Sequence, residues 1–166
     1  GDLARVYDWL KVYSLEEDAA ALLVRHCAET AGSTRLTFAY LDTVARAWAD
    51  AGVKTQEQAQ EHIARFRQRQ GGAAKIIKLW GQVGRPTQPE LELYEKWTSG
   101  WGFSDEAVLL AAGQTTGLRN PNFKYLNAIL EDYRARGFTS EEKLAQYLKT
   151  REQREAHVRH QAGLIL

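Results

Sequence analysis

The chain has 166 residues, of which 44% are hydrophobic, and its net charge is +1. These values exclude a wholly disordered chain, and so small a net charge selects no partner by itself. No run approaches the ~18 consecutive apolar residues of a membrane span, and no signal peptide is visible. The single cysteine, Cys27, cannot form an internal disulfide, so we expect a cytoplasmic protein. Because the chain begins with glycine and contains no methionine, we interpret it as a fragment of a longer protein.

Helical spacing of apolar residues runs through the first half of the chain. It predicts a short helix over residues 3–10. Ser14 then begins a capping-box pattern for a helix over residues 15–31. A third helix is predicted over residues 38–52, and it closes on a glycine, which suits the left-handed conformation after a helix. Thr55 begins a second capping-box pattern, so the fourth helix is expected to start at once.

The second half of the chain shows the same kinds of helix signal. A short helix is predicted over residues 73–80, and another, which closes on a glycine, over residues 123–137. The last helix is expected to start near Ser140. Caps that open helices are predicted at Thr87, Ser104 and Thr139.

Gly71 and Gly72 form the best candidate for a linker, because neighbouring glycines weaken a helix. They divide the chain into modules at residues 1–70 and 73–160. No segment shows the alternating pattern of a strand. The predicted fold class is therefore all-α, with two tandem copies of a small domain of about four to five helices each.

A repeated motif supports this organisation. Phe38-x-Tyr40-Leu41 recurs 85 residues later as Phe123-x-Tyr125-Leu126. Each copy continues with apolar residues four positions apart, which share one face of a helix. The resulting trios are Tyr40, Val44 and Trp48 in the first copy, and Tyr125, Ile129 and Tyr133 in the second. We expect both trios to pack in the core, with direct contact to a ligand as the alternative.

Catalytic chemistry finds little support. His157 and His160 lie three residues apart and could share a metal, but no third ligand is visible nearby. Gly81-x-x-Gly84 lacks the Lys-Ser/Thr ending of a phosphate-binding loop. We therefore predict no catalytic residue, no metal and no cofactor. Trp101 and Phe103, at a joint between helices, are interpreted as a plug under a loop, with a stacking platform for an unpaired base as the alternative.

The doubled Tyr-x-x-x-[Val/Ile]-x-x-x-[Trp/Tyr] motif, followed by Gly-Val-Lys-Thr-x-Glu-Gln-Ala at residues 52–59, resembles the DnaD-like primosomal protein family. The second module also resembles the family's domain opening, whereas the first is expected to lack it. The resemblance implies a non-enzymatic role in replication initiation at the primosome. It also implies binding of single- and double-stranded DNA without sequence specificity, and helicase loading with helicase or initiator proteins as partners.

Basic residues near the motif are the candidates for phosphate contacts. They are Lys124, Arg134, Arg136, Lys149, Arg151 and Arg154 in the second module, and Arg65, Arg67 and Arg69 as counterparts in the first. The alternative function is a protein-interaction scaffold that docks replication proteins or forms a homo-oligomer without direct DNA contact.

Overall fold

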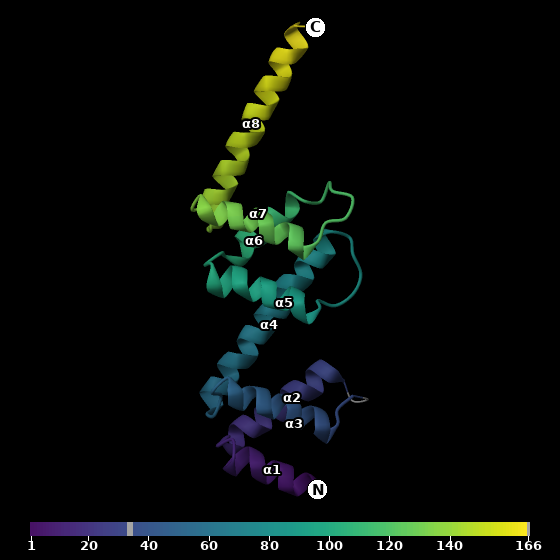
Figure 1. Ribbon diagram of the computed structural model, residues 1–166, viewed down its shortest axis with the longest axis vertical. Coiled ribbons are helices and arrows are strands. Elements are labelled where there is room, and N and C mark those ends of the chain that lie inside the picture. The colour runs from purple at the N-terminus through teal and green to yellow at the C-terminus, as the bar shows by residue number, and fades with distance from the viewer. Residues whose placement is uncertain (33–34, 166) are drawn as a thin grey trace. The chain divides into compact units, whose positions relative to one another are not determined.

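The computed structural model describes residues 1–32 and 35–165, and within those ranges every regular element is a helix. The chain divides into two compact units, residues 1–68 and 69–166, which we call unit 1 and unit 2. The predicted all-α class with two tandem domains is confirmed, and Figure 1 shows the elements in order along the chain.

Unit 1 contains α1 (Asp2–Lys11), α2 (Glu17–Ala31), α3 (Phe38–Asp50) and the first part of α4 (Gln56–Leu79). Its core gathers apolar residues from all four helices. The largest are Trp9, Leu23, Leu41, Trp48 and Ile63. Burial of these side chains, at roughly 25 cal/mol per Å² of apolar surface, is what holds the helices together.

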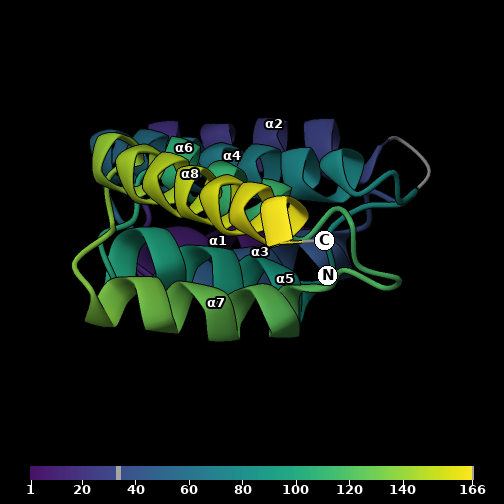
Figure 2. The ribbon, with the colours of Figure 1, turned by 90° about the horizontal axis from the view of Figure 1, so that it is seen from above.

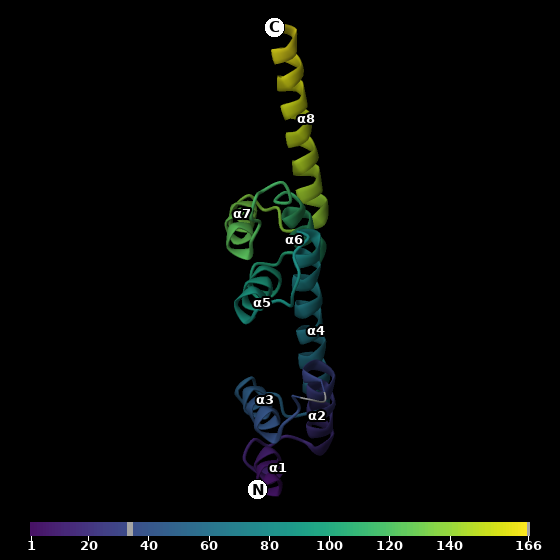
Figure 3. The same ribbon diagram turned by 90° about the vertical axis from the view of Figure 1, so that its right-hand side faces the viewer.

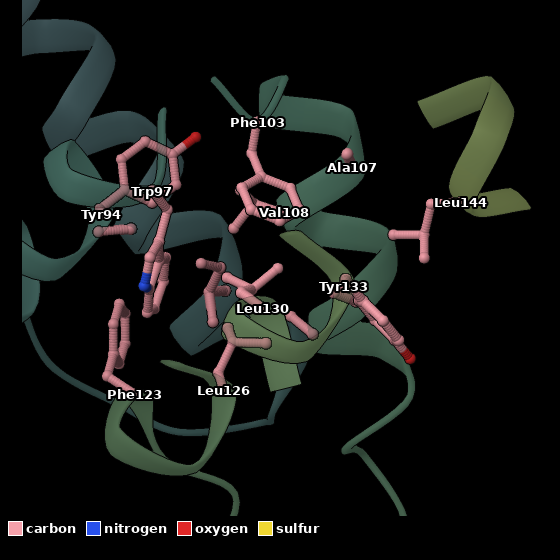
Figure 4. Packing of buried hydrophobic residues seen from close by; sticks show 14 of the residues in the cluster. Tyr94, Trp97, Phe103, Ala107, Val108, Phe123, Leu126, Leu130, Tyr133 and Leu144 are labelled. Carbon is pink, nitrogen blue, oxygen red and sulfur yellow. The ribbon is translucent and has the colours of Figure 1, made fainter. Parts of the chain in front are cut away.

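Unit 2 contains the rest of α4, then α5 (Gln88–Glu95), a π-helical turn η1 (Lys96–Gly100), α6 (Asp105–Gly113), α7 (Phe123–Ala135) and α8 (Glu141–Ile165). Within this unit, α5 and α7 form one layer, and the end of α4 forms the other with α6 and α8 (Figures 2 and 3). The core between them includes Trp97 stacked on Phe123, with a centroid distance of 5.7 Å (Figure 4).

The two units repeat each other down to single hydrogen bonds. Residues of α3 and α4 correspond to those 85 positions later, and residues of α1 and α2 to those 88 positions later. The indole N–H of Trp9 donates to Asp42 Oδ1 at 3.1 Å, and that of Trp97 donates to Asn127 Oδ1 at 2.9 Å. Helix α1 of unit 1 occupies the place of α5 and η1 in unit 2. The expectation that the first module is cut at its start stays a prediction.

Backbone hydrogen bonds show the same correspondence. The amide of Leu15 donates to the Trp9 carbonyl at 2.9 Å, and that of Phe103 donates to the Trp97 carbonyl at 3.0 Å. The matching crossings between loops are Glu16 N–H to Lys54 O at 2.9 Å and Ser104 N–H to Thr139 O at 3.1 Å. A shared set of backbone contacts therefore defines the repeated domain, although few side chains are identical.

Three local predictions were wrong. Gly71 and Gly72 lie inside α4 and form no linker, because the helix continues without interruption from Gln56 to Leu79. Ser14 does not cap α2; its φ is 54°, and the N-cap is Glu16. The cap of α8 is Ser140, whose Oγ accepts from Lys143 N–H at 3.3 Å, rather than Thr139.

The other caps are confirmed. Gln58 N–H donates to the Thr55 hydroxyl at 3.1 Å, and the Gln58 side chain accepts from the Thr55 amide at 3.1 Å. The Thr87 amide donates to Glu90 Oε2 at 2.7 Å, and Ser104 Oγ accepts from the Ala107 amide at 3.1 Å. Each cap satisfies amides that a helix start leaves without an intrahelical partner.

The buried face of α3 and α7, the helices that carry the repeated motif, also differs from the prediction. Tyr40 and Tyr125 are exposed, at 36% and 47%, so their assignment to the core is wrong. Val44 and Ile129 are half-buried, and only Trp48 and Tyr133 of the two trios are fully buried. The buried positions follow an i, i+4, i+7 pattern that starts one residue later. They are Leu41, Ala45 and Trp48 in α3, and Leu126, Leu130 and Tyr133 in α7, where Phe123 is buried as well.

Candidate nucleic-acid interface

A pocket of about 370 Å³ lies where α7 turns into α8. We call it the basic pocket. Its lining residues are Arg136, Phe138, Lys143, Gln146, Tyr147, Thr150, Arg151 and Arg154. Four of these carry a positive charge, none is a carboxylate, and two are aromatic.

The turn between α7 and α8 brings the lining residues of the basic pocket together. Arg136 is the C-cap of α7, and Gly137, with φ of 79°, reverses the chain in a conformation that only glycine adopts without strain. The Phe138 amide then donates to the Tyr133 carbonyl at 2.9 Å. Since Ser140 caps α8 directly afterwards, the residues before and after the turn face the same hollow.

Tyr147 organises the aromatic wall of the basic pocket. Its ring stacks on Phe138 at 4.6 Å and meets Tyr133 edge-on at 6.0 Å. The Arg136 guanidinium lies 5.7 Å from the ring centroid and donates to the Tyr147 hydroxyl at 3.2 Å. Burial raises the pKa of Tyr133, so this neighbouring phenol stays neutral and does not compensate the local positive charge.

Arg151 is held by contacts on two sides. It donates to Oε1 of Gln114, the C-cap residue of α6, at 3.2 Å and lies 3.6 Å from Glu155 on its own helix. Arg136 similarly pairs with Asp132 at 3.2 Å. Both ion pairs are solvent-accessible and contribute little to stability. An incoming phosphate can therefore replace these carboxylates at small cost.

Of the predicted DNA-binding residues, Arg136, Arg151 and Arg154 come together in the basic pocket. Lys149 lies outside it and lines a separate groove between α6 and α8 with Arg159. Lys124 is exposed on α7 and does not line the basic pocket.

The sequence-based prediction missed Lys143, Tyr147 and Phe138, which also line the basic pocket. A signal for two of them was available. Lys143, Tyr147 and Arg151 are spaced four residues apart, so they share one face of a helix.

A second group of cations surrounds Trp101. Lys96 Nζ lies 4.8 Å and the Arg134 guanidinium 5.1 Å from the indole ring. Trp101 is half-buried, whereas Phe103 is 3% exposed and plugs the core as predicted. The Trp101 face is already covered by cations, so it offers less room for a base than the basic pocket does.

The three arginines assigned to the first module are all paired with carboxylates. Arg65 contacts Glu61 at 2.6 Å and Arg67 contacts Glu29 at 2.7 Å. Arg69, the first residue of unit 2, contacts Glu95 at 2.5 Å, and it is the repeat equivalent of Arg154, which lies 85 positions later. The pairs of Arg65 and Arg67 are as solvent-accessible as those of Arg136 and Arg151, so ion pairing alone does not separate the two units. The pocket of unit 1 that Arg67 lines also contains Glu29, whereas the basic pocket has no carboxylate in its lining.

Within residues 1–32 and 35–165, no group of three or more His, Cys, Asp or Glu side chains could hold a metal ion. Burial raises the pKa of the Cys27 thiol to about 11, which makes it a poor nucleophile at neutral pH. Among the same residues, no helix is both long and apolar enough to cross a membrane.

Comparison with known proteins identifies the family. The sequence profile of a family described as replication initiation and membrane attachment matches residues 2–63 and 79–148. Searches of curated proteins and of solved structures gave no match. The two matched segments cover most of the chain and coincide with the repeated helical domain. The chain therefore belongs to the DnaD-like family of replication initiation and membrane attachment proteins.

Proposed function

We propose that this chain is a non-enzymatic, cytoplasmic DNA-binding module of replication initiation, and that the basic pocket of unit 2 binds single-stranded DNA. In this role it helps to remodel DNA or to load the replicative helicase at the primosome. The observation that carries the proposal is the lining of the pocket, which has four cations beside an aromatic wall and includes no carboxylate.

The chemistry of the pocket suits an unpaired nucleotide. Lysine and arginine neutralise phosphates, while Phe138 and Tyr147 offer an apolar wall for a base. The uncharged polar groups of the lining are those of Gln146, Thr150 and the Tyr147 hydroxyl, so the pocket has few means to read base edges. We therefore expect binding of single-stranded DNA with little sequence preference, and weaker binding of duplex DNA.

The charge of the two units agrees with this assignment. Unit 2 has fourteen Lys or Arg against eleven Asp or Glu, a formal charge of +3. Unit 1 has eight against ten, a formal charge of −2. Long-range attraction of DNA is accordingly directed to unit 2.

The test is a titration of the chain with fluorescently labelled single- and double-stranded oligonucleotides at low and at higher salt. Reversing two exposed lining cations, Lys143→Glu with Arg154→Glu, should weaken single-strand binding about tenfold or more and flatten its salt dependence. The matched control is Arg65→Glu on unit 1, which should change little. An unchanged affinity in the pocket variant, or no binding by the unmodified chain, would refute the assignment.

A second candidate function is a protein-interaction scaffold for the helicase or initiator. Exposed apolar residues on unit 1, among them Leu3 at 88% exposure, Val12 at 66% and Tyr7 at 61%, favour it. Pull-down of purified replication proteins by the chain and by a Leu3→Glu variant distinguishes this function from DNA binding, because Leu3 lies outside the basic pocket.

A further inference from the structure

Two cations of unit 2 lie beside one indole ring. Lys96 in η1 and Arg134 in α7 are exposed, and their charged groups lie 4.8 Å and 5.1 Å from the ring centroid of Trp101. Over residues 1–32 and 35–165, neither cation forms an ion pair with a carboxylate. We call these three residues the Trp101 cluster. Its two positive charges lie within about 10 Å of each other, one Debye length at 0.1 M salt, so an anion that contacts both relieves their repulsion.

The π-helical turn η1 places Lys96 over the ring. The amide of Trp101 donates to the Lys96 carbonyl, five residues back, at 2.8 Å. Unit 1 keeps this backbone contact, because the Tyr13 amide donates to the Asp8 carbonyl at 2.9 Å. The repeated fold therefore accounts for the turn, but not for the positive charges that unit 2 carries on it.

The equivalent positions of unit 1 have no cation. Asp8 stands at the position of Lys96. Ala49 stands at the position of Arg134. One cation is thus replaced by a carboxylate and the other by a methyl group, although both units share the fold. Because the fold does not require these cations, binding of an anion accounts for them better than packing does.

The Trp101 cluster and the basic pocket flank the same end of α7. Arg134 contacts the cluster and Arg136 lines the pocket, and residues two apart in a helix point to different sides. Their α-carbons lie no more than about 7 Å apart. The loop after Trp101 is also bonded to the turn before α8, where the Ser104 amide donates to the Thr139 carbonyl at 3.1 Å. A strand that leaves the pocket across the end of α7 therefore reaches the cluster next.

We propose that the Trp101 cluster binds a phosphate of the same DNA single strand whose neighbouring nucleotides occupy the basic pocket. This inference rests on the proposed function and extends it by a second subsite. The cluster takes a phosphate rather than a base because its cations already cover the indole ring, whereas the pocket offers an aromatic wall. The two subsites together require a minimum length of strand for full affinity.

The test measures the affinity of the full chain for labelled oligothymidines of about 4 to about 16 nucleotides, the range of site sizes of single-strand binding modules. The cluster variant carries Lys96→Gln and Arg134→Gln, neither of which lines the basic pocket. The matched control carries Lys75→Gln and Lys78→Gln, which remove the same charge from exposed positions of α4 in unit 2. Fluorescence anisotropy at low and at higher salt gives the affinity and its salt dependence.

The effect of the cluster variant should depend on the length of the strand. The shortest strands should bind it as they bind the unmodified chain, which also verifies that unit 2 is folded. The longest strands should lose about tenfold in affinity, and the slope of log affinity against log salt should fall by about 0.7 for each cation removed. The control should match the unmodified chain at every length.

Two results overturn the second subsite. One is a loss of affinity that is equal at all lengths or equal in the control, because it reflects net charge or the pocket itself. The other is no loss at any length. The proposed function is tested separately by the variant with Lys143→Glu and Arg154→Glu, which should weaken binding at every length. If only that variant weakens binding, the second subsite alone fails; if the unmodified chain binds no strand, both proposals fail.

Discussion

Units 1 and 2 share the same backbone fold but differ in the side chains around their cores. At the position of Tyr147 unit 1 has His62, which meets Trp48 edge-on at 5.4 Å just as Tyr147 meets Tyr133 at 6.0 Å. The packing contact is therefore kept while the chemistry of the ring changes. A repeated domain preserves the contacts that define its core and varies the residues on its rim.

One pair of equivalent positions shows the divergence most clearly. In unit 2, Arg151 donates to Gln114 at 3.2 Å and turns that site into part of a cationic pocket. In unit 1 the same two positions hold Phe66 and His26, whose rings meet edge-on at 4.8 Å. The hydrogen bond that holds Arg151 in unit 2 is thus replaced in unit 1 by a contact between two rings. This difference agrees with the proposed assignment of DNA binding to unit 2.

The largest expected effect comes from the close approach of α4 to α5 in unit 2. Gly72→Ala places a Cβ against the Tyr94 ring, which is buried and also bonded through its hydroxyl to Asp105, so neither side can yield easily. We expect a loss of about 1–3 kcal/mol of stability from overpacking. Urea unfolding followed by hydrogen exchange of unit 2 amides measures it.

Gly71→Ala is the control for this prediction, because nothing lies within 4 Å of its Cβ position. In a helix interior this change should stabilise by about 0.5–1 kcal/mol. Equal effects of the two substitutions would show that α4 does not approach α5 closely.

The next effect concerns DNA and distinguishes the two units directly. Tyr147→Ala removes one of the two rings of the aromatic wall and the hydroxyl that accepts from Arg136, so single-strand affinity should fall about tenfold, on the scale of one lost stacking interaction. His62→Ala changes the equivalent residue of unit 1 and should leave DNA affinity unchanged. Fluorescence anisotropy with a labelled oligonucleotide compares them, and similar losses in both variants would place binding on both units.

Much of this architecture could be predicted from the sequence. The doubled motif, the glycine after each signature helix and the caps at Thr55, Thr87 and Ser104 depend on contacts within a few residues, so local patterns identify them. The exposure of Tyr40 and Tyr125 could not be predicted in this way. Their spacing marks one face of a helix, but only tertiary packing decides which neighbouring face is buried, here the one through Leu41 and its repeat equivalent.

The site was partly predictable for a similar reason. Arg136, Arg151 and Arg154 were found because they are basic and near the motif. Their convergence with Phe138 depends on the turn at Gly137, whose geometry brings the end of α7 to the start of α8. The continuous α4 was missed because glycine propensity predicts a break at Gly72, whereas close packing against Tyr94 requires the glycine inside the helix.

A smaller effect arises at the loop before the second helix of each unit. Ser14 has φ of 54°, and its equivalent in unit 2 is Gly102, with φ of 80°. The left-handed region is unfavourable for a residue with a Cβ. Ser14→Gly should therefore stabilise unit 1 by up to about 1 kcal/mol, whereas Gly102→Ser should destabilise unit 2 by a similar amount. Thermal unfolding of the two variants gives opposite shifts of Tm if the loops are equivalent, and shifts of the same sign would contradict the equivalence.

The smallest effect is a pH dependence confined to unit 1. Burial, and then the nearby positive charge of Arg67, hold the pKa of His26 below its usual 6.5, and its Nδ1 is buried without a hydrogen-bond partner in the described part of the chain. Because the folded state disfavours the protonated ring, the stability it contributes is complete above pH 6.5 and is lost as the pH falls below that value. Hydrogen exchange of unit 1 amides should accelerate between about pH 7 and pH 5 beyond the intrinsic change, while unit 2, with Gln114 at this position, should not follow. In His26→Gln the extra acid sensitivity of unit 1 should disappear, and its persistence would assign it to another group.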